Sequence, residues 1–93
     1  MMATIIMPEG AIISTVLPVD VDERVKRLQD IVGGPIEGIS LPEGRYLFLK
    51  ENGKDGPHIV NTKATGLVHE TGLIHESDYI AGIAVVLPRE ELE

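Results

Sequence analysis

Short apolar runs separated by turn-forming residues cover much of this chain, a pattern typical of β-strands. Two such runs, 3–7 and 11–17, flank Pro8-Glu9-Gly10. Proline presets φ for a type I turn and glycine takes the left-handed position, so these runs predict a β-hairpin. The alternation in the second run, with Ile13 and Leu17 on one side, predicts that at least one face of that strand is buried.

The segment after Pro18 changes to a helical period. Asp20 is a good N-cap, and Glu23 three residues later completes a capping box. Gly33-Gly34-Pro35 ends the helix because glycine supplies the C-terminal cap and proline cannot continue it. Apolar residues between these limits recur every three or four positions and predict one buried stripe: Val21, Val25, Leu28 and Val32.

A second hairpin is predicted for 36–41 and 45–50, which Pro42-Glu43-Gly44 joins in the same way. The run 45–50 and the last apolar run, 80–87, are apolar on both faces, so each is expected inside a sheet that is covered on both sides. Gly82 within the last run would permit a close backbone approach.

These elements predict an α+β fold in a single domain, residues 1–93. A mainly antiparallel sheet of about five strands, built from the two Pro-Glu-Gly hairpins and a C-terminal strand, packs on one capped helix. One helix cannot cover both faces of such a sheet. Either the segment 57–78 packs on the second face or another subunit does, so a homodimer is one of the two alternatives. Residues 88–93 are predicted to form a solvated acidic tail.

Composition narrows the class of protein. Apolar residues make up 43% of the chain and charged residues 25%, as in folded globular proteins. Without cysteine there is neither a disulfide nor a thiolate metal site. The chain lacks an apolar run of the roughly 20 residues that span a bilayer and lacks the basic flank of a signal peptide, which predicts a cytoplasmic protein without membrane insertion. The net charge of −7 argues against nucleic acid as a partner, because clustered Lys and Arg bind phosphate backbones.

The segment 57–78 holds all three histidines, His58, His69 and His75. Connections this long are uncommon in compact domains and tend to be functional or disordered. We predict a long loop or a β-arm here. A pattern of two apolar residues followed by His-Glu occurs twice, at 67–70 and 73–76, and each copy would form one strand of the β-arm. A short helical turn capped by Asn61 is the other interpretation, although Gly66 opposes a long helix.

Two catalytic patterns in this segment are incomplete. His69 and His75 are six residues apart, whereas a helical zinc site of a protease needs two histidines four apart. The contiguous residues 75–78 include His, Ser and Asp, but a hydrolytic triad is assembled from separate parts of a fold. We therefore predict no catalytic residues, no metal and no cofactor, and we expect a binding protein rather than an enzyme.

Two binding surfaces remain as hypotheses. A partner protein would contact residues of the long segment, although ordinary packing on the core explains the apolar ones equally well: Leu67, Val68, His69, Leu73, Ile74 and His75. A small ligand such as a nucleotide would need hydrogen-bond donors and cations. The candidates for this alternative are His58, Asn61, Lys63 and Arg45.

The order of these features resembles a small family of unknown function (domain of unknown function 3846) carried by bacteriophages, especially those of actinobacteria, and by mobile elements. The resemblance covers nearly the whole chain. Its motifs are Val32-Gly33-Gly34, Ile36-Glu37 with Leu41-Pro42, Lys50-Glu51-Asn52-Gly53-Lys54, Asn61, Ala64-Thr65, Leu67 and Asp78-Tyr79-Ile80-Ala81-Gly82. The stretch 68–77 is longer than the family's pattern.

The resemblance implies a phage accessory protein and brings no catalytic residues with it. Together with the absence of catalytic groups, it leads us to expect a non-enzymatic phage protein in the host cytoplasm that binds and modulates a host protein. Host takeover, interference with growth or division, superinfection exclusion and inhibition of a defence system all fit this expectation. A module that binds or sequesters a small ligand or nucleotide is the alternative.

Overall fold

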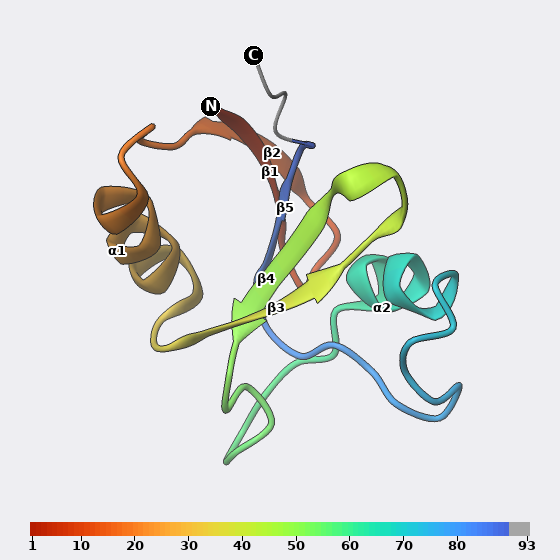
Figure 1. The fold of residues 1–93 in the computed structure, drawn as a ribbon. Helices are drawn as coiled ribbons and strands as arrows, with labels where there is room; N and C mark the ends of the chain where they lie inside the picture. Colours follow the sequence, from red (N-terminus) through yellow and green to blue (C-terminus); the bar gives the residue numbers. More distant parts are fainter. Residues whose placement is uncertain (90–93) are drawn as a thin grey trace.

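Five strands form one antiparallel sheet in the computed structural model, which describes residues 1–89 (Figure 1). The strand order is β2-β1-β5-β4-β3. Two helices pack on the sheet, so the predicted α+β class with a five-stranded sheet is confirmed. In chain order the elements are β1 (Met2–Ile6), β2 (Ile12–Val16), α1 (Val21–Val32), β3 (Ile36–Ser40), a 3₁₀ turn (Pro42–Gly44), β4 (Tyr46–Lys50), α2 (Thr62–His69) and β5 (Ala84–Leu87).

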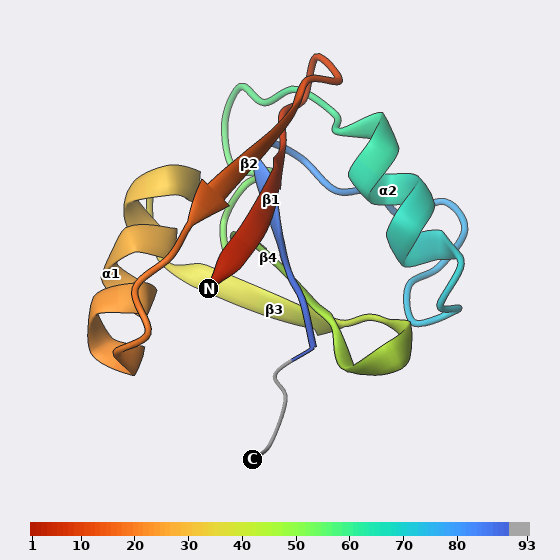
Figure 2. The ribbon, with the colours of Figure 1, turned by 90° about the horizontal axis from the view of Figure 1, so that it is seen from above.

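The two helices lie on opposite sides of the sheet, as the view from above makes clear (Figure 2). The core is therefore divided into two clusters. The cluster on the α1 side contains Ala3, Leu17, Leu28, Val32, Val85 and Leu87. The cluster on the α2 side contains Ile6, Leu41, Leu47, Ala64, Val68, Ile80 and Ala84. The segment 57–78 thus supplies the cover for the second face through α2.

Both predicted hairpins are present. The first is closed by Met7 and Ala11, where the Met7 N–H donates to the Ala11 carbonyl at 2.9 Å, and Gly10 has a φ of 108°. The second turn has a different backbone, because Glu43 as well as Gly44 has a positive φ, 68° and 76°. The same three residue types therefore form two different turns.

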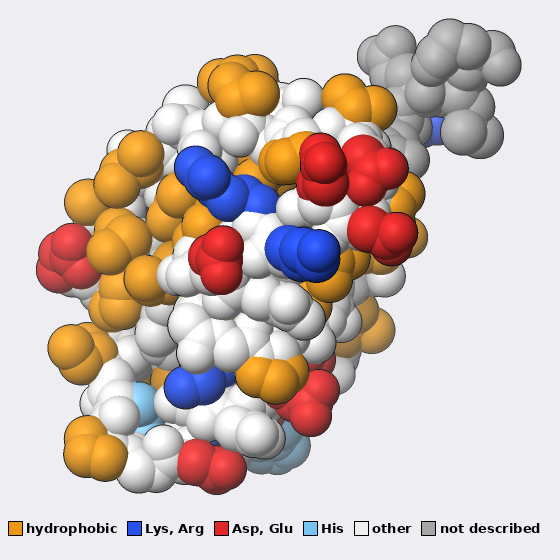
Figure 3. Space-filling model, turned by 90° about the vertical axis from the view of Figure 1, so that its left-hand side faces the viewer, with side chains coloured by type: hydrophobic (Ala, Val, Ile, Leu, Met, Phe, Trp, Pro, Cys, Tyr) orange, Lys and Arg blue, Asp and Glu red, His pale blue; other side chains and the backbone are white. Residues whose placement is uncertain are grey.

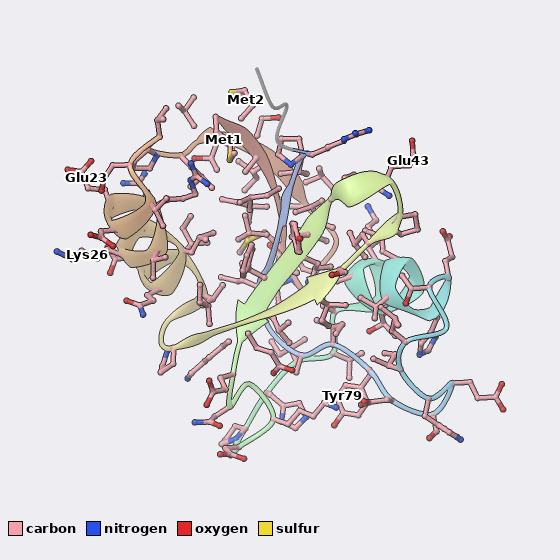
Figure 4. The ribbon with its side chains drawn as sticks, viewed as in Figure 1. Met1, Met2, Glu23, Lys26, Glu43 and Tyr79 are labelled. Atoms are coloured by element: carbon pink, nitrogen blue, oxygen red, sulfur yellow. The ribbon has the colours of Figure 1, made fainter. Side chains whose placement is uncertain are left out.

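Helix α1 begins and ends where its caps predict. The Asp20 carboxylate accepts a hydrogen bond from the Glu23 N–H at 3.0 Å, and Gly33 adopts a φ of 90°. Leu28 and Val32 are buried in the α1-side cluster. Glu23 and Lys26 lie on the side of α1 that faces away from the sheet (Figure 4).

The C-terminal strand is central, as its two apolar faces predict, but it is shorter than 80–87. β5 pairs with β1 on one side and β4 on the other. The backbone turns at Gly82, whose φ is 79°, and Ala81 forms only an isolated bridge with Val60. The expected close approach at Gly82 is wrong, because an added Cβ there would meet nothing within 4 Å. The close approach occurs instead at Gly53, where a Cβ would lie 3.2 Å from the Ala81 carbonyl oxygen.

Residues 62–69 of the long segment form helix α2, whereas residues 70–78 form a loop with turns and build no strand of a β-arm. Asn61 is fully buried and accepts a hydrogen bond from the Ala64 N–H at 3.1 Å. Its amide donates to the carbonyls of Ile6 and Gly82, each at 2.9 Å. This one side chain caps α2 and ties it to β1 and to the approach to β5, which overrides the weak helix propensity of Gly66.

Strand β2 corrects a second expectation, since its apolar side chains are exposed on both faces. Ile12, Ile13 and Val16 are 60%, 47% and 66% exposed. The alternation in 11–17 is real, but β2 is the outermost strand and the helices cover the middle of the sheet. Only Leu17, just beyond the strand, is buried.

Two further observations complete the fold. In residues 1–89 no helix is both long and apolar enough to cross a membrane. Of the predicted acidic tail 88–93, Pro88 and Arg89 are exposed, and residues 90–93 lie outside the described part of the chain.

Candidate functional site

Half of the predicted partner-binding residues contribute to the core. Val68 is completely buried on α2, which leaves it no surface for a partner. Leu67 and Ile74 are half-buried and pack against the same α2-side cluster. Leu73 is 64% exposed and is the apolar residue of this group that faces solvent. The alternative of packing on the core therefore describes most of the apolar residues in this segment.

His69 and His75 hold the loop that follows α2. The His69 Nε2–H donates to the carbonyl of Asp78, with 2.7 Å between nitrogen and oxygen. His75 Nδ1 accepts a hydrogen bond from the Ser77 N–H at 3.1 Å and lies 2.6 Å from Ser77 Oγ. Among residues 1–89, no group of three or more His, Asp or Glu side chains is placed to hold a metal ion.

The four residues of the small-ligand alternative do not come together. Asn61 is the buried cap of α2 described above. Lys63 donates through Nζ to the Gly10 carbonyl at 2.8 Å, beside the first hairpin. Arg45 donates to the Pro42 carbonyl at 3.3 Å, beside the second hairpin. His58 lies in a third place, with Nδ1 3.0 Å from the Gly56 carbonyl. These side chains therefore build no shared anion site.

Side chains from two distant segments meet around Tyr79, at the end of the sheet away from the chain termini (Figure 4). The His58 ring stacks on the Tyr79 ring, with 5.8 Å between centroids, and His58 Nε2 lies 3.0 Å from the Tyr79 hydroxyl. Lys54 Nζ lies 4.3 Å from the centre of the Tyr79 ring and forms an ion pair with Asp78. We call these four residues the Tyr79 cluster.

The hydrogen bonds of the Tyr79 cluster stabilise the ionised form of Asp78. The hydrogen bond from Lys54 lowers the pKa of Asp78 below 3.8, and the hydrogen bond from the Tyr79 backbone N–H lowers it further. Asp78 is therefore a weak general base at neutral pH. The cluster ties the turn after β4 to the segment that enters β5.

A cavity of about 200 Å³ adjoins the Tyr79 cluster. It is smaller than the 300–1,000 Å³ that is usual for ligand sites. Its walls carry cations and acids together: Lys50, Lys54, Glu37, Glu51, Asp55 and Asp78. Opposite charges at close range favour neither an anionic nor a cationic ligand.

A group of exposed apolar side chains lies on the outer strand β2 and next to it in the chain. We call residues 12–16 with their outward backbone groups the β2 edge. Figure 3 views the molecule from the α1 side and shows hydrophobic side chains gathered along the border where the β1–β2 hairpin lies. Met2 on the neighbouring strand β1 is also exposed, as are Val19 and Val21, which follow β2 in the chain.

The register determines which backbone groups of the β2 edge are open. The Leu17 N–H donates to the Met1 carbonyl, and Ala11 accepts from Met7, so the odd-numbered residues of this stretch face β1. In an antiparallel strand the alternate residues point the other way. The N–H and C=O groups of Ile12, Ser14 and Val16 therefore point away from the sheet, and no further strand of residues 1–89 lies beside them.

Sequence reasoning missed the β2 edge, although a signal was present. Residues 11–17 contain no charge and no proline, and most of them are β-branched. Natural edge strands usually carry lysine, proline or a bulge that prevents pairing with other chains. The same uncharged, β-branched pattern also predicts a buried face, because a buried strand has the same composition.

Comparisons with known proteins identify no relative. The chain matches no protein-family model. Searches of the curated proteins and of the solved structures also found no match. The resemblance to a phage family therefore stays a prediction.

Proposed function

We propose that this chain is a non-enzymatic binding protein whose protein partner adds a strand to the β2 edge. The observation that carries the proposal is an outer strand with exposed apolar side chains on both faces and with outward backbone groups that no other strand of residues 1–89 pairs. Such an edge provides both elements of strand addition. Main-chain hydrogen bonds supply affinity, and alternate side chains supply specificity.

The charge distribution supports a protein partner with an apolar segment. The chain carries a net charge of −7, yet residues 11–17 carry none. An extended apolar peptide would therefore dock without burying an unpaired charge, which would otherwise be costly. The biological role that agrees with the resemblance is that of a phage accessory protein that modulates a host protein in the host cytoplasm.

A single proline tests this proposal. The Ser14 N–H points outward, so Ser14→Pro removes an edge donor without breaking a hydrogen bond to β1. Tagged wild-type protein and Ser14→Pro are used to capture proteins from host lysate, and Leu73→Asp serves as the matched control on the other exposed surface. We expect a host protein that wild type and Leu73→Asp retain and Ser14→Pro loses.

Reconstitution with the captured protein completes the test. A synthetic peptide with the sequence of residues 11–17 should compete with the full chain for the purified partner, because it presents the same strand. Retention of the partner by Ser14→Pro would contradict strand addition. Loss in Leu73→Asp alone would instead assign the contact to the segment after α2.

A further inference from the structure

We infer that the β2 edge of one copy pairs with the β2 edge of a second copy, antiparallel and around a twofold axis at Ser14. The inference rests on the proposed function in one respect, since both use the same edge. A second copy then competes with any other partner for that edge. Self-association would keep the apolar surface covered until a partner displaces the second copy.

The backbone of this edge is self-complementary. Its outward residues, Ile12, Ser14 and Val16, are spaced two apart and are symmetric about the middle one. An antiparallel pairing centred there places Ser14 opposite Ser14 and Ile12 opposite Val16 of the second copy. Residues that face each other in this way exchange both of their N–H···O=C bonds. Every outward donor and acceptor of both strands would be satisfied.

The side chains agree with this register. On the α2 side of the sheet, exposed Ile12 would lie opposite exposed Val16 at both ends of the pairing, with serines at the axis. On the α1 side, exposed Ile13 would lie opposite half-buried Thr15. β-Branched residues directly opposite each other are favourable cross-strand pairs. If the two strands shifted by one residue relative to each other, these side-chain pairs would be lost. The outward N–H and C=O groups of one copy would then no longer face those of the other.

Charge favours this surface over the rest of the molecule as a contact between copies. Two copies that each carry −7 repel each other at long range. The β2 edge contains no charged side chain, so pairing there buries no charge of either copy. Because the interface has no ion pair to lose, added salt should strengthen the dimer by screening the repulsion between the acidic copies.

The outer strand β3 is a poorer choice for self-pairing. It follows Pro35 and carries Glu37 and Gly38 at exposed positions. Charged residues and proline are the usual means by which an edge is protected from pairing. A second copy therefore finds one open edge in the described part of the chain.

The twofold axis permits a test of the register itself. Position 14 would face its own copy, so Ser14→Lys alone and Ser14→Glu alone each place like charges opposite each other. A mixture of the two variants places opposite charges there. Sedimentation velocity over a micromolar to millimolar series should show wild type passing from monomer to dimer and each single variant associating about tenfold more weakly. The equimolar mixture should recover the dimer, and Leu73→Asp should behave as wild type.

The outcomes separate this inference from the proposed function. A wild-type chain that stays monomeric over the whole series, or a mixture that stays as weak as its components, overturns self-pairing at Ser14. If such a monomer still captures a host protein in a Ser14-dependent manner, the proposed function stands alone. A dimer that Ser14→Lys weakens, combined with partner capture that Ser14→Pro does not change, would overturn the proposed function and leave the dimer.

Discussion

The two outer strands of this sheet differ in how they meet solvent. β2 exposes Ile12, Ile13 and Val16, whereas the exposed positions of β3 are Glu37, Gly38 and Ser40. Both strands belong to hairpins with the same Pro-Glu-Gly sequence in the turn and both have five residues. The two edges therefore differ in chemistry although their hairpins are alike: β3 carries a charge that opposes pairing with another chain, and β2 carries none. This contrast is the reason why we propose β2, rather than β3, as the edge that associates.

Proline substitutions at neighbouring positions of β2 should differ strongly in their cost to stability, because alternate backbone groups of this strand face β1 or solvent. Thr15 lies in the phase that faces β1, opposite Ala3, so Thr15→Pro should remove a ladder hydrogen bond and lower the free energy of unfolding by about 2–3 kcal/mol. Ser14→Pro should lower it by less than about 1 kcal/mol. Urea denaturation followed by circular dichroism measures both. If both variants lost the same free energy of unfolding, the Ser14 N–H would not point away from the sheet as the register indicates.

A smaller effect compares the packing of the two edges. At Gly38 of β3 an added Cβ would lie 2.9 Å from Cε1 of the Phe48 ring, which packs in the α1-side cluster. Gly38→Ala should therefore destabilise the fold by about 1–2 kcal/mol through overpacking. Ser14→Ala on exposed β2 should change stability by no more than about 0.5 kcal/mol. Thermal unfolding of the pair is the measurement, and a neutral Gly38→Ala would contradict tight packing at β3.

Adding a charge to β2 and removing the charge from β3 should reverse the tendency of the two edges to associate. Val16→Lys places a charge on β2 and should reduce association while stability stays within about 0.5 kcal/mol of wild type. Glu37→Val removes the charge from β3 and should increase the mass of the assemblies, because a second edge becomes available. Light scattering over a concentration series compares the two variants. Association that is unaltered in both would show that neither edge takes part.

The smallest effect is that of pH on stability. Acid should weaken the contact of Asp78 with Lys54 and should not alter β2. The pKa of Asp78 is lowered by the hydrogen bond from Lys54, so the ionised carboxylate is the form that stabilises the fold. This contribution is present above pH 3.8, the ordinary pKa of the group, and is lost as the pH falls through the lowered value. Residues 11–17 contain no titratable side chain.

An NMR titration checks this sign. The Asp78 carboxyl should titrate below pH 3.8 in wild type, and Lys54→Met should raise its midpoint towards that value. The amide of Tyr79, which donates to the Asp78 carboxylate at 2.8 Å, should lose protection over the same range. An unchanged midpoint in Lys54→Met would contradict the assignment of Lys54 as the main cause.

Local features of the fold could be predicted because their causes lie within a few residues. Asp20 with Glu23 predicts where α1 begins, and Gly33 predicts where it ends. The central place of β5 followed from its two apolar faces. The helix at Asn61 was one of two interpretations, since a cap that also bonds to Ile6, distant in the sequence, is visible only in the folded chain.

The exposure of β2 could not be predicted from nearby residues. β1 and β2 have similar apolar runs, and the short Pro-Glu-Gly connection between them predicts that they pair with each other. The pairing of β5 with β1 is visible only in the folded chain, and it leaves β2 outermost with its apolar residues on the surface. Caps and turns depend on the neighbouring backbone, whereas the position of a strand in a sheet depends on contacts with residues far away in the chain.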